Sequence, residues 1–192
     1  MCRKAPDAWK KRPMLKKMLF AAFTLLCMPG FVMAANEKID PATYLCAEYV
    51  SSEAVLQGEP PLFEGLQIDG YASAAVNMDV ASPDTLHILL GQAYMWCEKR
   101  PTDTVLSVWQ QMRATGPVPI GEWNAKTSTC ADFAMAQEDA SGFIIWLDGY
   151  NRRLQNTTKS ILNSDEDIQS FIDACLISPK RTMLEVLQEQ AK

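Results

Sequence analysis

The chain has 192 residues, of which 48% are hydrophobic and 21% are charged, and acidic residues outnumber basic ones. Because seven basic residues and a single acidic residue lie within residues 1–34, the remainder carries 11 basic and 22 acidic residues. A chain this acidic argues against nucleic acid and anionic membrane surfaces as partners. A single histidine and the lack of a Cys-x-x-Cys pair argue against a zinc site.

Residues 1–34 have the pattern of a secretory signal peptide. Basic residues precede an apolar stretch from Leu19 to Met28, which a Pro-Gly pair ends, and small or apolar residues lead up to Ala34. The apolar stretch is too short for a membrane-spanning helix, and it is followed by a cleavage pattern. We therefore expect cleavage near Ala34, export to the periplasm, and no membrane insertion of the mature chain.

Residues 35–114 are predicted to form a first helical module. Hydrophobic spacing indicates helices over residues 41–57, 62–75 and 83–97, and a last one that begins at Pro101. Asp40 is a candidate N-cap for the first of these helices. Ser82 followed by Pro83 is a strong start signal for the third.

Residues 115–126 contain two prolines and two glycines. This composition predicts an extended linker without regular structure. Trp123 lies within the linker, and we expect its large side chain to dock on one of the modules.

Residues 127–192 are predicted to be a second copy of the module. Helices are expected around residues 130–135, over 140–154, after a cap at Ser164, and from Pro179 onward. The copies share three elements: Cys46-Ala47-Glu48-Tyr49 with Cys130-Ala131-Asp132-Phe133, Asp69-Gly70-Tyr71 with Asp148-Gly149-Tyr150, and Cys97, Pro101, Thr104, Leu106 and Val108 with Cys175, Pro179, Thr182, Leu184 and Val186. The expected fold is all-α, with two tandem modules of about four helices each.

The cysteines indicate disulfides. Cys2 and Cys27 leave with the signal peptide, and an even number of cysteines in an exported chain implies a disulfide framework. Because each copy of the repeat should close on itself, the predicted pairs are Cys46–Cys97 and Cys130–Cys175. In the chain-entropy model, each loop of this length stabilises its module by roughly 4 kcal/mol.

No residue pattern indicates catalysis. The Asp-Gly-Tyr motif is best explained by a glycine that lets another helix approach closely, beside a solvated aspartate at Asp69 and Asp148. His87 has neither a counterpart in the second copy nor the partners that a triad or a zinc site requires. We expect no catalytic residue, no metal and no cofactor, and hence a protein that is not an enzyme.

Each module resembles the periplasmic acid-stress chaperones HdeA and HdeB. The resemblance covers residues 42–113 and 127–190, and it rests on Cys46-Ala47-Glu48-Tyr49 with Cys97 and Pro101, and on Thr129-Cys130-Ala131-Asp132-Phe133 with Cys175 and Pro179. The chain departs from the family by holding two modules and by having Leu45 where the threonine is expected. The family implies small helical proteins that are dimers at neutral pH, loosen in acid and bind unfolding clients.

Two functions follow as expectations. As an acid-stress chaperone, the chain would bind clients through its apolar helices, and the two modules would face each other as a covalent dimer. The candidate client-binding residues are Phe63, Leu66, Ile68, Phe143, Ile144 and Trp146. The alternative is a periplasmic binding module, such as an immunity protein, an inhibitor or a secretion accessory, with one defined protein partner at neutral pH.

Overall fold

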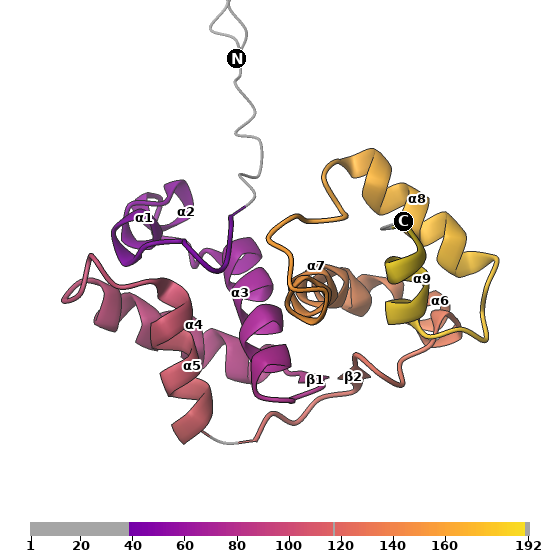
Figure 1. Cartoon of the computed structure of the whole chain (residues 1–192), viewed down its shortest axis with the longest axis horizontal. Coiled ribbons are helices and arrows are strands. Elements are labelled where there is room, and N and C mark those ends of the chain that lie inside the picture. Colours follow the sequence, from indigo (N-terminus) through magenta and orange to yellow (C-terminus); the bar gives the residue numbers. More distant parts are fainter. Residues whose placement is uncertain (1–38, 117, 191–192) are drawn as a thin grey trace, which may run out of the picture. The chain divides into compact units, whose positions relative to one another are not determined.

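The computed structural model describes residues 39–116 and 118–190, which belong to one compact unit and are mostly helical (Figure 1). The predicted signal peptide lies outside these residues. A departure from the all-α expectation is a small antiparallel pair, β1 (Val80–Ala81) and β2 (Trp123–Asn124), in which Val80 lies opposite Asn124 and Ala81 opposite Trp123. The linker was predicted to lack regular structure, and this is wrong at β2.

The first half follows the predicted order of helices. Its elements are α1 (Cys46–Val50), α2 (Glu53–Leu56), α3 (Leu62–Ala75), α4 (Pro83–Cys97) and α5 (Val105–Thr115). The bounds expected for α3 and α4 are confirmed, and the Ser82 hydroxyl accepts a hydrogen bond from Thr85 N as the cap of α4.

The single helix predicted over residues 41–57 is wrong. The chain instead turns at residues 41–43 and then forms two short helices that are separated at Ser51 and Ser52. The Ser51 hydroxyl donates back to the carbonyl of Ala47 at 2.8 Å, and Ser52 has extended backbone angles before α2. Serine side chains compete in this way for backbone hydrogen bonds, which favours helix ends over helix interiors.

The second half has four helices over the described residues. They are α6 (Cys130–Met135), α7 (Gln137–Leu154), α8 (Asp165–Leu176) and α9 (Met183–Gln190). The Ser164 hydroxyl accepts from Asp167 N at 3.2 Å, so the predicted cap of α8 is confirmed. Three acidic residues follow in its first turn, where they face the positive end of the helix dipole.

The last helix of each half begins directly after a capping threonine, and the predicted starts at Pro101 and Pro179 are wrong. Thr104 caps α5 by accepting from Ser107 N at 3.3 Å, and Thr182 does the same for α9. The prolines lie in the preceding corner, where their carbonyls accept hydrogen bonds from the first helix of their own half.

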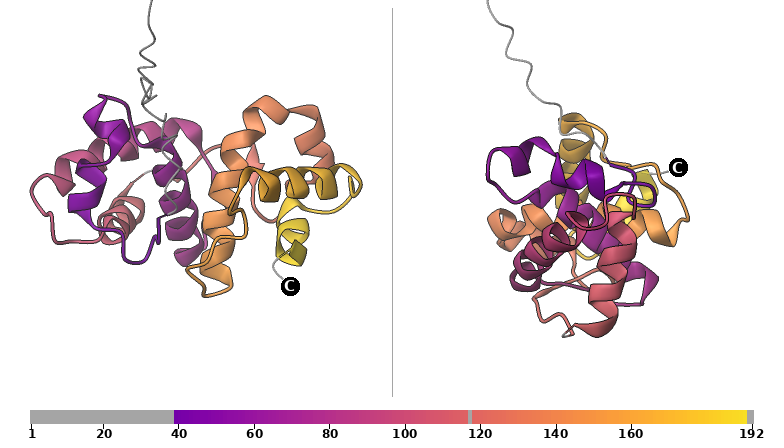
Figure 2. Two further views of the ribbon diagram at one scale, coloured as in Figure 1. Left: turned by 90° about the horizontal axis from the view of Figure 1, so that it is seen from above. Right: turned by 90° about the vertical axis from the view of Figure 1, so that its left-hand side faces the viewer.

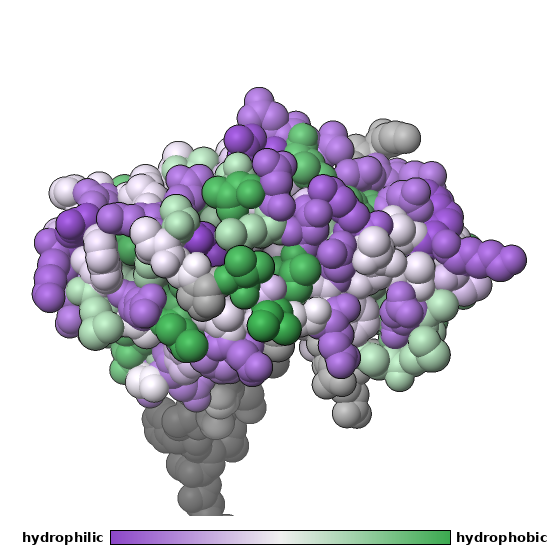
Figure 3. Space-filling view, turned by 90° about the horizontal axis from the view of Figure 1, so that it is seen from below, coloured by the Kyte–Doolittle hydropathy of each residue, from purple (hydrophilic) through white to green (hydrophobic). Residues whose placement is uncertain are grey.

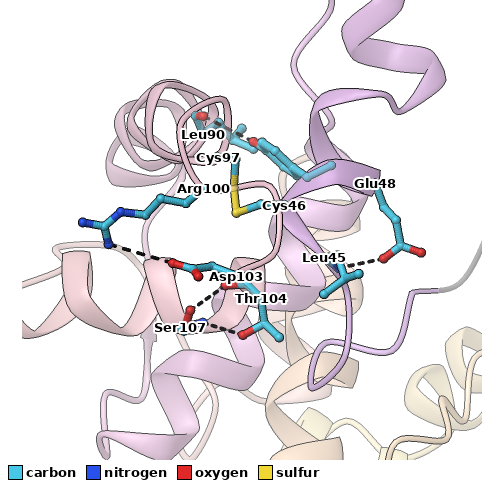
Figure 4. Close-up of a disulfide and its surroundings, with 10 residues drawn as sticks. Leu45, Cys46, Glu48, Leu90, Cys97, Arg100, Asp103, Thr104 and Ser107 are labelled. Carbon is cyan, nitrogen blue, oxygen red and sulfur yellow. Dashed lines mark hydrogen bonds and ion pairs between the residues drawn. A yellow bond between two sulfur atoms is a disulfide. The ribbon is translucent and has the colours of Figure 1, made fainter.

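Both predicted disulfides are present, and each fastens the same kind of corner. Figure 4 shows the corner at Cys46–Cys97. Cys46 N donates to the carbonyl of Asp103 and Cys130 N to that of Arg181, each at 2.9 Å. The repeat is therefore a repeat of backbone hydrogen bonds as well as of residue types. Disulfides of this kind indicate an oxidising location outside the cytoplasm. Within the described ranges, no helix combines the length and the apolarity that crossing a membrane requires.

The departure at Leu45 changes the start of α1. In the second half, Thr129 accepts from Asp132 N, and the Asp132 carboxylate accepts from Thr129 N at 2.7 Å. The N–H and the hydroxyl of Thr129 both donate to the Asp132 carboxylate and lower its pKa. Leucine offers no acceptor, so α1 retains only the bond from Leu45 N to the Glu48 carboxylate.

Each half has its own apolar core. One core contains Cys46, Tyr49, Ile68, Leu90, Cys97, Val105 and Trp109, and the other contains Cys130, Phe133, Trp146, Leu147, Phe171, Cys175 and Leu187. Leu66 of α3 packs against both cores, and Ala74 and Ala81 of the first half belong to the second core. The two helical halves therefore meet through α3, which lies beside α7 in Figure 1 and in the left view of Figure 2.

Candidate functional site

The most extensive contact between helices joins α3 and α7, and we call it the α3–α7 seam. A Cβ atom at Gly70 would lie 1.9 Å from the carbonyl oxygen of Trp146, and one at Gly149 would lie 2.1 Å from that of Gln67. Only glycine permits backbones to come this close. The prediction that the Asp-Gly-Tyr glycines allow close helix approach is confirmed, and the two copies of the motif approach each other's helix.

Asp69 is fully buried at the seam, so the prediction of a solvated aspartate is wrong. Its carboxylate forms a two-pronged ion pair with Arg113 at 2.6–2.8 Å. The indole nitrogens of Trp109 and Trp146 also donate to it, at 2.8 and 2.9 Å. The donors come from α5 and α7, so one carboxylate on α3 joins three helices and both halves. A charged carboxylate that is buried away from water requires such partners.

Asp148, the counterpart of Asp69, is also buried, so the solvated prediction is wrong there too. Its carboxylate accepts a hydrogen bond from Ile161 N at 3.1 Å. It therefore holds the loop between α7 and α8 against α7. The two aspartates share a position in the repeat, and Asp69 joins the two halves through Trp146.

A second carboxylate, Asp79, binds α7 one turn further along, at Tyr150. Tyr150 donates its hydroxyl to Asp79 at 2.6 Å, Lys126 lies 2.8 Å from it, and Ala125 N donates to the Asp79 carbonyl. Burial alone raises the pKa of Asp79, but the hydrogen bonds from Lys126 and Tyr150 outweigh it and lower the pKa. Burial and the Asp79 carboxylate raise the pKa of Tyr150.

Four aromatic rings form a continuous stack along this side of α7. The ring of Trp123 stacks on Phe143 at 5.2 Å, Phe143 on Trp146 at 5.7 Å, and Trp146 on Tyr150 at 5.2 Å. The prediction that Trp123 docks on a module is confirmed. The linker is thus held to the second half by an aromatic contact and to the first half by β1.

A buried arginine completes the contact between the halves. Arg152 of α7 donates to the Gln67 side chain at 3.0 Å and to the carbonyl of Ile39 at 2.9 Å. It also donates to the carbonyl of Thr158. Burial lowers the pKa of Arg152. This side chain therefore joins α7 to α3 and to the segment that precedes α1.

The six candidate client-binding residues do not form a surface in this structure. Leu66, Phe143 and Trp146 line a cavity of about 70 Å³ at the seam, together with Asp69 and Trp123. Ile68 belongs to the core of the first half and Ile144 to that of the second, and Phe63 is half-buried on α3. Client binding by these residues stays a prediction, and it requires the seam to open.

Some apolar side chains are exposed in the folded state. Val118 and Ile120, in the segment before β2, are 75% and 87% exposed. Figure 3 looks onto the side of the molecule on which β1 and β2 lie, and hydrophobic side chains gather near the middle of this face.

The geometry defines a mostly helical chain of two disulfide-closed halves joined by a polar and aromatic seam. Among the described residues, no three side chains of His, Cys, Asp or Glu gather as metal ligands would, and His87 lies exposed on α4. Neither a protein-family model, nor a curated protein, nor a solved structure matches this chain.

Proposed function

We propose that this chain is an exported, non-enzymatic protein that binds unfolding client proteins at low pH, similar in its action to HdeA and HdeB. The observation that carries the proposal is the α3–α7 seam. It buries apolar and aromatic side chains between two halves, and the carboxylates of Asp69 and Asp79 bind Trp146 and Tyr150 across it. A seam of this kind keeps an apolar surface buried for as long as the carboxylate contacts across it persist.

Acid weakens the contact between the two halves through two effects. A protonated Asp79 carboxylate is a poorer acceptor for Lys126 and Tyr150, so its contacts with them weaken. At the same time the 22 acidic residues after residue 34 lose their charge, and the 11 basic residues repel one another. Both effects favour separation of the halves.

The lowered pKa of Asp79 sets the direction of the pH dependence. A carboxyl group whose pKa is lower in the folded state than in the unfolded state stabilises the fold above the unfolded pKa, at about pH 4. That stabilisation is lost as the pH falls through the folded value. The contact of Asp79 with Tyr150 and Lys126 is therefore kept at neutral pH and lost in acid.

The disulfides limit how far each half opens. Each one joins the first helix of its half to the end of a later helix and lies in the core of that half. The seam contains no disulfide in the described part of the chain, so α3 and α7 are free to part while each half keeps its cross-link. In this proposal the tandem chain is the covalent counterpart of the family's dimer.

We expect the folded chain to loosen reversibly as the pH is lowered from about 7 to about 2, with the main change below about pH 4. Circular dichroism would follow the helices, and small-angle scattering would follow the radius of gyration. Expansion with partly retained helical signal and recovery on neutralisation is the expected result. An unchanged profile over the whole range would contradict the proposal and favour a binding module that works at neutral pH.

A further inference from the structure

The helix α4 presents an apolar face that the fold of the chain does not explain. Ile88 and Met95 are 59% and 55% exposed, and they flank Gly91 at helical spacing on the same side. Next to them, Leu89, Trp96 and Met112 line a groove of about 420 Å³ between α4 and α5. We call Ile88, Gly91, Gln92 and Met95 the α4 face.

The repeat supplies an internal comparison for this face. Counted from Cys97 and Cys175, the positions of Ile88, Gly91 and Met95 correspond to Glu166, Gln169 and Asp173 of α8, all of which are exposed. There, Gln169 donates to Asp173 at 2.8 Å, as expected of a solvated helix. The module therefore folds with polar residues at these positions, and their apolar character in α4 has another cause.

Gly91 strengthens this argument. A glycine inside a helix costs about 1 kcal/mol relative to alanine, and a Cβ atom at Gly91 would meet nothing within 4 Å. The chain's own packing thus gives no reason for it. At the α3–α7 seam, by contrast, the glycines allow a neighbouring helix to come close. A glycine between two exposed apolar side chains suits the same kind of contact with a helix outside the chain.

The charges around the α4 face indicate that this helix belongs to a second copy. Apart from Arg113, which is buried and paired with Asp69, residues 83–116 carry three acidic and two basic residues, whereas the chain after residue 34 has twice as many acidic as basic residues. Two copies therefore meet here with less repulsion than other surfaces would impose. Asp84 lies one turn before the face and Lys99 one turn after it, and both are exposed.

We propose that two copies of this chain associate through α4, antiparallel about a two-fold axis near Gly91. In this arrangement Asp84 of each copy lies opposite Lys99 of the other, and Ile88 opposite Met95. The exposed apolar side chains of each copy reach the groove of the other, as a self-complementary two-fold interface requires. This surface is separate from the α3–α7 seam, and its occupation does not depend on acid or on a client.

Sedimentation equilibrium of the full mature chain at neutral pH tests the association. We expect a mass twice that of the chain, and the monomer mass for a variant with Ile88→Glu and Met95→Asp, which carries the acidic residues found in α8. Ile177→Glu, at an exposed position of the second half, is the control and should stay dimeric. Circular dichroism of each variant checks that it is folded.

A cross-link gives an independent readout. Gln92→Cys places a thiol near the axis, and mild oxidation should produce a covalent dimer on a non-reducing gel. Gln169→Cys, at an exposed position of α8 one residue before the counterpart of Gln92, should remain largely monomeric. A monomeric wild-type chain, a dimer that survives the double substitution, or equal cross-linking of the two cysteine variants would each overturn the proposal.

Discussion

Replacing Asp69 with asparagine should lower the free energy of unfolding by about 3–5 kcal/mol. The side chains of Arg113 and Asp69 are both buried in their ion pair. The substitution therefore leaves the Arg113 guanidinium buried without a counter-charge. It also turns an amide group toward some of the indole and guanidinium donors. Urea unfolding at neutral pH, followed by circular dichroism, measures the change.

Asp165→Asn is the matched control for this experiment. Asp165 is an exposed residue in the first turn of α8, and removing its charge should cost less than about 1 kcal/mol. Equal and small effects of the two substitutions would show that the Asp69 network does not hold the helices together.

Replacing Gly70 with alanine is the second change with a large expected effect. The added Cβ atom would lie 1.9 Å from the carbonyl oxygen of Trp146, so α3 and α7 must move apart. Because backbone atoms cannot give way as a flexible side chain does, we expect a loss of about 3 kcal/mol or more in unfolding free energy. Urea unfolding again provides the measurement.

Gly142→Ala, on α7, is the matched control for Gly70→Ala. A Cβ atom there would be in ordinary contact with Leu66, 3.6 Å from its nearest atom. Since alanine is favoured over glycine in helices by about 1 kcal/mol, this variant should be as stable as the wild type or more stable. A Gly70→Ala variant of unchanged stability would contradict the close approach of α3 and α7.

Local signals predicted much of the fold. The bounds of α3 and the caps at Ser82 and Ser164 depend on residues that are neighbours in the sequence, and these predictions are confirmed. The repeat supplied the pairing of the cysteines. The starts expected at Pro101 and Pro179 failed, because the corner carbonyls there bind the first helix of the half.

The seam could not be predicted in the same way. Asp69 looked like a solvated aspartate because its partners lie 40 to 77 residues further along the chain. Trp109 and Arg113 share one face of α5 at a spacing of four residues, and this was the only local signal of the network. The pairing of β1 with β2 likewise joins segments more than 40 residues apart, which composition alone does not reveal.

We propose that acid converts this chain into a binder of unfolding proteins. Light scattering of an aggregating client between about pH 2 and about pH 4, with and without the mature chain, tests it most directly. An unrelated acid-stable protein at equal concentration serves as the control. We expect the chain to suppress scattering in this range and to have no effect at neutral pH. A lack of suppression at every acidic pH would contradict the proposed function.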